Sequence, residues 1–383
     1  MKIKNLFLFY ILIIQDIIII TESKINKFWE EKGEIKQISN EYKKMILKPD
    51  YNVKNIGRFF VSEDIIYLAQ SGSAIEFYLI AKSAEIILVE DSFSNFPEEL
   101  EKPRYAIYVN EKILLDSTID EKEKTVLLFN YESEQEIKIR IILLSEALAG
   151  CIGIKNINVI SSYSNDEIIK PTENKKYKIE FIGDSITCGY GIEAKSPDEF
   201  YSTKTQNFEK SYAFLSAKEL DFDYSAVCYS GSGIISLGNI KTNRYTTINY
   251  FSYNKEWDFK KYNSDIIVIN LGTNDYGYIL FEANIDKYIK KYAEFLKLVR
   301  EKNPNSYIIC LIGMMGCEEL FPLIDEAINS LEDQKIYEFL MPIQKIEDGI
   351  GAQYHPNYVS HAKWGKLLAK IIKDIINGDI LKQ

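Results

Sequence analysis

The sequence predicts a two-domain protein in which an all-β domain precedes an α/β domain built on a parallel sheet. The chain has 383 residues, which exceeds one ordinary domain and suits two. Between residues 58 and 161, short runs alternate apolar and polar side chains, as at Ile137, Ile139 and Ile141, with the period of a half-buried strand. After residue 176, strand patterns alternate with helix patterns, which is typical of a parallel sheet covered by helices on both faces.

The first half contains several short strand patterns separated by turn signals. Residues 105–109 and 112–115 are apolar runs on either side of Asn110-Glu111, which predicts a hairpin. Further short strands are expected at 65–68, 75–80, 86–89, 126–129, 137–141 and 152–160. This pattern favours an antiparallel sandwich or jelly roll. We place the β domain at residues 24–165 and the second domain at 166–383, with the polar stretch 161–176 as the best linker.

The second half is expected to alternate five strands with four helices. The strands are expected at 178–182, 224–229, 266–271, 307–312 and 337–341, and the helices at 211–220, 285–302, 318–331 and 359–376. In the second of these helices Ile285, Tyr288, Ile289, Tyr292 and Leu296 recur at intervals of three and four, which gives one apolar face. In sheets of this kind, ligands bind beyond the carboxyl ends of the strands.

Composition argues against several classes of partner. A net charge of −10 disfavours a nucleic acid or an anionic membrane surface, because both attract clustered Lys and Arg. The five cysteines form no Cys-x-x-Cys pair, which favours isolated thiols over a disulfide framework or a metal site. We therefore expect no metal and no cofactor. The only histidines are His355 and His361, and the second falls on the last helix, where we expect a structural role.

Residues 1–23 have features of a signal peptide or membrane anchor. Lys2 and Lys4 precede an apolar segment at 6–20. Asp16 interrupts this segment at a cost of roughly 3 kcal/mol, and no Ala-x-Ala cleavage pattern follows. We expect an export signal or N-terminal anchor, and hence a secreted, cell-surface or periplasmic protein, with an Ile-rich extension of a cytoplasmic protein as the alternative. Beyond this anchor we expect no stable membrane partner, because no other segment is long and apolar enough to span a bilayer.

Four segments that carry chemically useful side chains fall at or after strand ends in the second half. They are Gly183-Asp184-Ser185, Tyr229-Ser230-Gly231-Ser232-Gly233, Gly272-Thr273-Asn274-Asp275 and Tyr354-His355-Pro356-Asn357. Each alone is more often a turn, a capped loop or a structural histidine. Their joint occurrence at one sheet edge is far more specific than any single member.

The four segments can be given roles in acyl transfer. Ser185 would attack a carbonyl carbon, and His355 would take its proton and return it to the leaving alcohol. The backbone N–H groups of Ser185 and Gly231 and the side-chain amide of Asn274 would surround the negative oxygen of the tetrahedral intermediate. The pattern therefore predicts a serine hydrolase site.

Taken together, these residues resemble the GDSL or SGNH hydrolase superfamily, which places Ser, Gly, Asn and His in four blocks in this order. The finer likeness is to family two of the carbohydrate esterases. It rests on Gly-Asp-Ser-Ile-Thr-Cys-Gly-Tyr-Gly at 183–191, Trp257-Asp258-Phe259, Asn270-Leu271-Gly272-Thr273-Asn274-Asp275, His355-Pro356-Asn357, and on residues 68–73 and 105–110. The resemblance implies an N-terminal jelly roll followed by a three-layer α/β/α hydrolase domain with a flavodoxin-like parallel sheet. It also implies O-deacetylation of sugars and of plant polysaccharides such as xylan or glucomannan.

One position departs from the superfamily pattern. An Asp normally stands three residues before the histidine, whereas Ala352 stands there in this chain. Some members of the esterase family are similar in lacking the acid, with a backbone carbonyl orienting the histidine. We therefore expect a Ser185–His355 dyad that works through an acyl-enzyme. Asp184 and Asp275 are expected to anchor turns.

Two aromatic residues are candidates for substrate binding. Tyr354 stands where family members often have an aromatic beside the sugar, and Trp257 lies in an aromatic-rich insertion between residues 233 and 266. Packing is the alternative for both residues, and for Trp257 it is the favoured one.

The leading functional hypothesis is a carbohydrate O-acetyl esterase whose partner is an acetylated carbohydrate. A lipid or short-chain acyl esterase on the same scaffold is the second hypothesis. A glycan-binding protein with an inactive site is the third.

Overall fold

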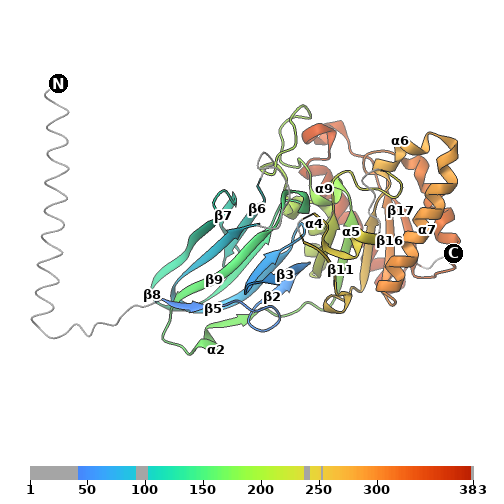
Figure 1. The fold of residues 1–383 in the computed structure, drawn as a ribbon. Helices are drawn as coiled ribbons and strands as arrows, with labels where there is room; N and C mark the ends of the chain where they lie inside the picture. The colour runs from blue at the N-terminus through green and yellow to red at the C-terminus, as the bar shows by residue number, and fades with distance from the viewer. Residues whose placement is uncertain (1–41, 92–101, 237–241, 252, 381–383) are drawn as a thin grey trace, which may run out of the picture. The chain divides into compact units, whose positions relative to one another are not determined.

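The computed structural model describes residues 42–91, 102–236, 242–251 and 253–380. Lys43–Gln383 forms one compact unit, which contains a ten-stranded antiparallel sheet and a five-stranded parallel sheet (Figure 1). The export segment expected at 1–23 lies outside the described residues. No helix in the described part of the chain is long and apolar enough to cross a membrane.

The antiparallel sheet is built from the first half of the chain. Its path runs β3-β4-β9-β5-β8-β6-β7, with β1 paired to β9 and with β2 and β10 paired to β5. The strands are β1 (Lys43–Met45), β2 (Lys54–Ile56), β3 (Phe59–Ser62), β4 (Ile65–Leu68), β5 (Ala74–Glu90), β6 (Arg104–Val109), β7 (Lys112–Thr118), β8 (Glu123–Leu143), β9 (Ile152–Ile160) and β10 (Ile169–Pro171). The hairpin expected at Asn110-Glu111 is present, and both residues have positive φ.

Two strands are longer than the sequence predicts. β5 replaces the two strands expected at 75–80 and 86–89, and β8 replaces those at 126–129 and 137–141. The two strands pair along most of their length, and their register shifts twice, once between Ala81 and Ser83. Such bulges bend a strand without ending its ladder. The periodicity is broken there, so the sequence predicts two strands where there is one.

Alternate residues of the long strands form the core of this sheet. Phe77 and Leu79 are fully buried, whereas Tyr78 between them is 36% exposed. Ile137, Ile139 and Ile141 lie in the same core. The alternation predicted for a half-buried strand is therefore present at these positions.

The parallel sheet is built from the second half of the chain. Its strands are β11 (Lys178–Gly183), β12 (Asp223–Cys228), β15 (Ile266–Asn270), β16 (Tyr307–Ile312) and β17 (Ile336–Leu340). They lie in the order β12-β11-β15-β16-β17, all parallel. Numbered along the chain this is 2-1-3-4-5, the flavodoxin-type order, whose topological switch point lies between the first and third strands. That point lies beside the carboxyl ends of β11 and β15.

Helices cover both faces of the parallel sheet. The helices of the described residues are α2 (Asn165–Ile168), α3 (Ser185–Cys188), α4 (Tyr212–Leu220), α5 (Thr242–Tyr245), α6 (Tyr276–Ile279), α7 (Ile285–Lys302), α8 (Phe321–Asn329) and α9 (Tyr358–Asn377). Successive residues of β15 point to opposite faces: Val268 packs with α4 and α9, and Ile269 packs with α7 and α8. Both faces are apolar, as expected of a buried parallel strand. A small hairpin of β13 (Thr247–Asn249) and β14 (Tyr253–Glu256) completes the fold.

The region expected to be a linker contains ordered elements. α2 and β10 fall within residues 161–176, and Ile169–Pro171 pairs with β5. The antiparallel sheet thus includes residues beyond position 165. No domain boundary is marked by the compact unit itself, so the boundary at 165 stays a prediction.

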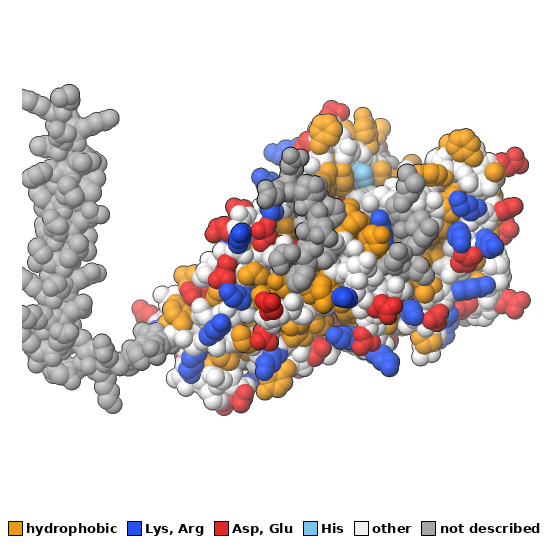
Figure 2. All heavy atoms as spheres, in the orientation of Figure 1, with side chains coloured by type: hydrophobic (Ala, Val, Ile, Leu, Met, Phe, Trp, Pro, Cys, Tyr) orange, Lys and Arg blue, Asp and Glu red, His pale blue; other side chains and the backbone are white. Residues whose placement is uncertain are grey.

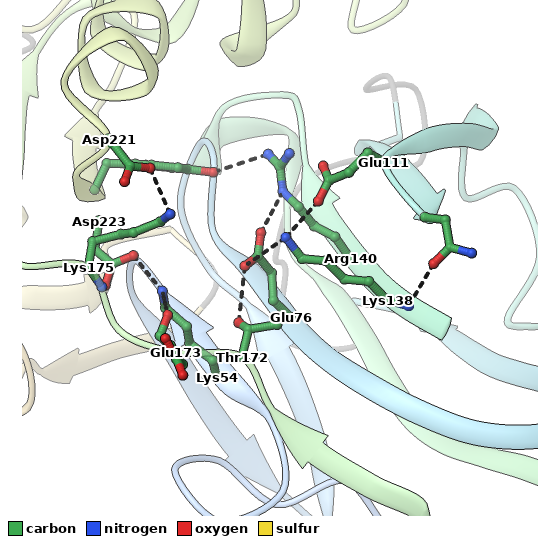
Figure 3. A network of polar contacts seen from close by, with 12 residues as sticks. Lys54, Glu76, Glu111, Lys138, Arg140, Thr172, Glu173, Lys175, Asp221 and Asp223 are labelled. Atoms are coloured by element: carbon green, nitrogen blue, oxygen red, sulfur yellow. Dashed lines mark hydrogen bonds and ion pairs between the residues drawn. The ribbon is translucent and has the colours of Figure 1, made fainter. Parts of the chain in front are cut away.

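Ion pairs and hydrogen bonds connect the first and second halves of the chain in a pocket lined by Lys54, Arg140 and Asp223 (Figure 3). Lys54 Nζ on β2 lies 2.5 Å from Asp223 Oδ1 on β12. Arg140 on β8 lies 2.6 Å from Glu209 and 3.5 Å from Glu76. These pairs are largely removed from solvent, so solvent screens them less than surface pairs. The Lys54–Asp223 pair joins the two sheets directly, and the Arg140–Glu209 pair joins the antiparallel sheet to the segment just before α4.

Candidate active site

The turn after β11 places Ser185, which is 6% exposed, at the carboxyl end of the sheet. Asp184 caps α3, and its Oδ1 accepts a hydrogen bond from the backbone N–H of Ile186 at 2.9 Å. Gly183 has no room for a side chain, because a Cβ there would lie 2.0 Å from Thr187 Oγ1. The strand therefore passes directly into the helix, and Ser185 becomes its first residue.

His355 lies in contact with Ser185. Its Nε2 is 2.8 Å from Ser185 Oγ. Its Nδ1 is 3.2 Å from two backbone oxygens, those of Ala352 and Gln353. Carbonyl oxygens only accept, so the proton belongs on Nδ1, and Nε2 is left to accept from the serine hydroxyl. Carbonyls thus orient the imidazole where a carboxylate commonly does.

Two non-glycine residues before His355 have left-handed backbones. Gln353 has a φ of 48° and Tyr354 a φ of 63°. This conformation costs energy and persists only when its surroundings hold it. The N–H of Gln353 donates to Pro197 O at 2.9 Å, and the Gln344 amide donates to Tyr354 O at 2.9 Å. These bonds hold the turn that brings the Gln353 carbonyl to the imidazole.

An aromatic ring lies against the imidazole of His355. The Tyr190 ring packs against it with centroids 4.2 Å apart, and the Tyr190 hydroxyl donates to the Gln353 side chain. Burial lowers the pKa of His355, and the two carbonyl contacts only partly oppose this. In Figure 2 a histidine side chain reaches the surface among hydrophobic side chains near the top of the view. Because its pKa is lowered, the His355 imidazole is neutral at pH 7, as a general base must be.

The residues expected to form the oxyanion hole lie around this turn. Gly231 has a φ of +77° and open space where a Cβ would be. The Asn274 amide nitrogen donates to Ser232 O at 2.9 Å and to Asp184 Oδ2 at 3.2 Å. Both of its hydrogens have acceptors, so donation to an oxyanion would require it to leave the longer of these bonds. The oxyanion roles of Ser185, Gly231 and Asn274 stay predictions.

Asp184 and Asp275 are both buried and bind backbone amides. Asp275 accepts from the N–H groups of Ile234, Ile235 and Ser236, each at 2.7 Å. Burial raises the pKa of Asp184 to about 7 and also raises that of Asp275. Neither carboxylate has a hydrogen bond to His355 among the described contacts. They anchor the two turns, as expected.

The two aromatic candidates for substrate binding differ in solvent exposure. Tyr354 directly precedes His355 and is 64% exposed, so its ring is available to a ligand. Trp257 is only 5% exposed and lies in the core of the antiparallel sheet, edge-on to Phe59. We correct the substrate-binding hypothesis for Trp257, because a ring enclosed by core side chains has no face to offer a sugar.

Two further residues near the site were not singled out from the sequence. Arg244 lies over the rings of Tyr250 and Phe251 and donates to Ser232 Oγ at 3.3 Å. Glu146, from the segment between β8 and β9, binds Ser230. The only signal for Glu146 is its place as an acid that, with Ser145, interrupts an apolar stretch from Ile141 to Ala149.

The site residues fall within a region that matches a known family. Residues 181–359 match the model of the GDSL-like Lipase/Acylhydrolase family. These residues form a GDSL-like lipase/acylhydrolase domain. Ser185, Gly231, Asn274 and His355 of the acylhydrolase domain all lie inside the matched range.

Similar proteins include curated esterases. Over 218 residues the chain is 33% identical to the cellulase/esterase CelE of Acetivibrio thermocellus, covering 54% of this chain and 26% of that protein. Over 270 residues it is 25% identical to an acetylxylan esterase/glucomannan deacetylase of Cellvibrio japonicus, covering 68% and 73% of the two chains. The chain therefore spans about a quarter of the length of the first relative and 73% of the second.

The fold is also similar to solved structures. A family two carbohydrate esterase from Clostridium thermocellum, in complex with cellohexaose, has a TM-score of 0.74 and 26% identity, covering 85% of this chain and 99% of that one. An acetyl xylan esterase from Butyrivibrio proteoclasticus has a TM-score of 0.77 at 22% identity, covering 88% and 98%. The likeness thus extends beyond the acylhydrolase domain and includes the antiparallel sheet.

Proposed function

We propose that this protein is a carbohydrate O-acetyl esterase that uses Ser185 and His355 as a catalytic dyad. The observation that carries the proposal is the 2.8 Å contact between Ser185 Oγ and His355 Nε2, with Nδ1 facing two carbonyl oxygens. Similarity to proteins named acetylxylan esterase and family two carbohydrate esterase supports acetylated polysaccharides as substrates.

The reaction would proceed through an acetyl-enzyme. Ser185 Oγ attacks the acetyl carbonyl carbon while its proton passes to His355 Nε2. The tetrahedral intermediate collapses, the bond from carbon to the sugar oxygen breaks, and that oxygen takes the proton from Nε2. Water then attacks the carbonyl carbon of acetyl-Ser185 and gives one proton to Nε2. The bond from that carbon to Ser185 Oγ breaks, Oγ takes the proton back from Nε2, and the acetic acid that leaves ionises to acetate.

The decisive experiment measures acetate release from acetylated xylan and glucomannan. The wild-type protein should release acetate, and Ser185→Ala should abolish nearly all of that release while keeping its fold. As a matched control, Ser202→Ala alters another serine of the same domain, one that has no contact with His355, and should remain active. Full activity in Ser185→Ala would refute the dyad.

The same assay separates the alternatives. Activity that rises with the acyl chain length of p-nitrophenyl esters would favour the lipid or short-chain acyl esterase. Glycan binding without acetate release would favour a binding protein with an inactive site. Neither alternative has an observation of its own in the site geometry.

We also propose a jelly-roll arrangement for the ten-stranded sheet and action outside the cytoplasm. The first is supported by the antiparallel pairing of β5 with both β8 and β9. The second is supported by Lys2 and Lys4 before the apolar segment at 6–20. Fractionation of expressing cells tests the second, and recovery of all protein in the cytoplasm would refute it.

A further inference from the structure

A buried carboxylate from the antiparallel half contacts the loop that carries Gly231. Glu146 is 1% exposed. Its Oε2 accepts from the Ser230 backbone N–H at 2.7 Å, and its Oε1 accepts from the Ser230 hydroxyl at 2.6 Å. One side chain therefore accepts from both hydrogen-bond donors of the residue that directly precedes Gly231.

Gly231 is held by the turn around it and not by packing of its own: the Ser232 N–H donates to Tyr229 O at 3.1 Å across it. It is exposed, and nothing lies within 4 Å of the position its Cβ would occupy. Its own packing therefore does little to fix the direction of its N–H. Because Ser230 and Gly231 share a peptide unit, the hold on Ser230 restricts the rotations that would turn that N–H away.

The contacts of Glu146 differ from those of other buried acids that join the two sheets. Asp223 is paired with Lys54, and Glu180 with Arg58. Among the described residues, Glu146 has no ion pair, and its remaining partner is the Gln206 amide at 3.3 Å. Burial raises the pKa of Glu146. Burying an acid without a cation costs free energy. A role only in joining the two sheets would not explain why an acid stands at this position.

A second contact from the same half reaches the neighbouring residue. The Gln70 amide donates to the Tyr229 hydroxyl at 2.6 Å, and Gln70 is fully buried. The segment that carries Glu146 is itself fixed, since Leu144 O accepts from the Phe208 N–H at 3.0 Å. The antiparallel half thus holds both residues that precede Gly231.

We propose that Glu146 is a positioning residue that aims the Gly231 N–H at the oxyanion, so that the antiparallel half completes the esterase site. This inference rests on the function proposed above. It assigns Glu146 an effect on the transition state and none on substrate affinity. The inference also makes the antiparallel half necessary for catalysis, independently of any glycan binding by that half.

The test uses two variants that separate contact from charge. Glu146→Asp keeps the charge but is one methylene shorter, so it withdraws from Ser230. Glu146→Gln loses the charge but can accept from the Ser230 N–H and donate to its hydroxyl. We expect Glu146→Asp to lower kcat roughly 10- to 100-fold with KM little changed, because small misplacements of catalytic groups carry costs of this size. Glu146→Gln should remain within about threefold of wild type.

Asp223→Asn is the matched control. Asp223 also ties the antiparallel half to β12, but at the opposite end of that strand from Ser230. The Asp223→Asn variant should keep the wild-type kcat even if its melting temperature falls. Amide hydrogen exchange gives a readout that does not need activity: residues 229–233 should exchange faster in Glu146→Asp and not in Asp223→Asn.

The outcomes are separable. No acetate release by the wild-type protein refutes the proposed function, and hydrogen exchange then decides whether Glu146 holds the loop. An active wild type with an unchanged kcat in folded Glu146→Asp overturns the inference. Equal losses of kcat in Glu146→Asp and Asp223→Asn also overturn it. If Glu146→Asp does not fold, the test rests on Glu146→Gln. A loss of kcat in Glu146→Gln as large as that in Ser185→Ala would then overturn the inference.

Discussion

The ring of Tyr190 lies against the imidazole of His355, with centroids 4.2 Å apart and planes at 32°. Tyr190 in turn stacks on Tyr201 at 4.8 Å. This cover excludes water from one face of the imidazole, and loss of water disfavours the charged form of histidine. The ring therefore helps to keep the general base neutral and fixed in orientation.

Removing this ring should change the pH dependence of the reaction. In Tyr190→Ala the imidazole gains solvent, so its pKa should rise toward 6.5 and the acid limb of kcat/KM should move up with it. We also expect kcat/KM to fall about tenfold because the base is less well oriented. Tyr190→Phe keeps the ring and is the control, with the wild-type midpoint. An unmoved limb in Tyr190→Ala would contradict the shielding role.

The wild-type profile itself gives a second prediction. Because burial lowers the pKa of His355, the neutral base persists to a lower pH than a free histidine would allow. We expect the midpoint of the acid limb of kcat/KM to lie below 6.5, because protonation removes the acceptor at Nε2. Initial rates between pH 4 and pH 8 test this. A midpoint above 6.5 would argue against the buried imidazole as base.

The parallel half could be predicted closely because its elements obey simple periodicities. The helix expected at 285–302 is α7, with the same bounds, since one apolar stripe packs on the sheet. The antiparallel half was predicted less well because bulges interrupt the alternation within β5 and β8. Backbone pairing continues along those strands past the bulges, although the alternation of side chains is interrupted there.

The site shows the same division. Ser185 and His355 could be predicted to meet because both follow strand ends at one edge of a parallel sheet. The contact of Glu146 with Ser230 could not, since it depends on how two halves of the chain pack. Packing was the favoured interpretation for Trp257, but a sugar contact stayed open because an aromatic side chain suits both a sugar face and a hydrophobic core.

A third prediction concerns the turn that presents Ser185. Gly183→Ala would place a methyl group 2.0 Å from Thr187 Oγ1 and 2.7 Å from Thr187 Cβ. These atoms are in a buried helix that cannot move freely, so we expect a loss of about 1–3 kcal/mol in the free energy of unfolding. Gly277→Ala is the control, because nothing lies within 4 Å of its Cβ. Equal stability of the two variants in urea unfolding would contradict the steric argument.

The last prediction concerns His361, which is fully buried and accepts a hydrogen bond from the Tyr212 N–H at Nδ1. Burial lowers its pKa to about 3. As the pH falls below about 6.5, the unfolded chain binds a proton at this residue and the folded chain does not, so stability falls with decreasing pH. Between about pH 6.5 and 3 this contributes a slope of about 1.4 kcal/mol per pH unit. His361→Asn keeps an acceptor for the Tyr212 N–H and cannot titrate, so the slope of its free energy of unfolding should be smaller by that amount. Urea unfolding of both proteins at intervals from pH 4 to pH 8 measures the difference, and parallel curves would show that His361 is protonated to the same extent in the folded and unfolded states.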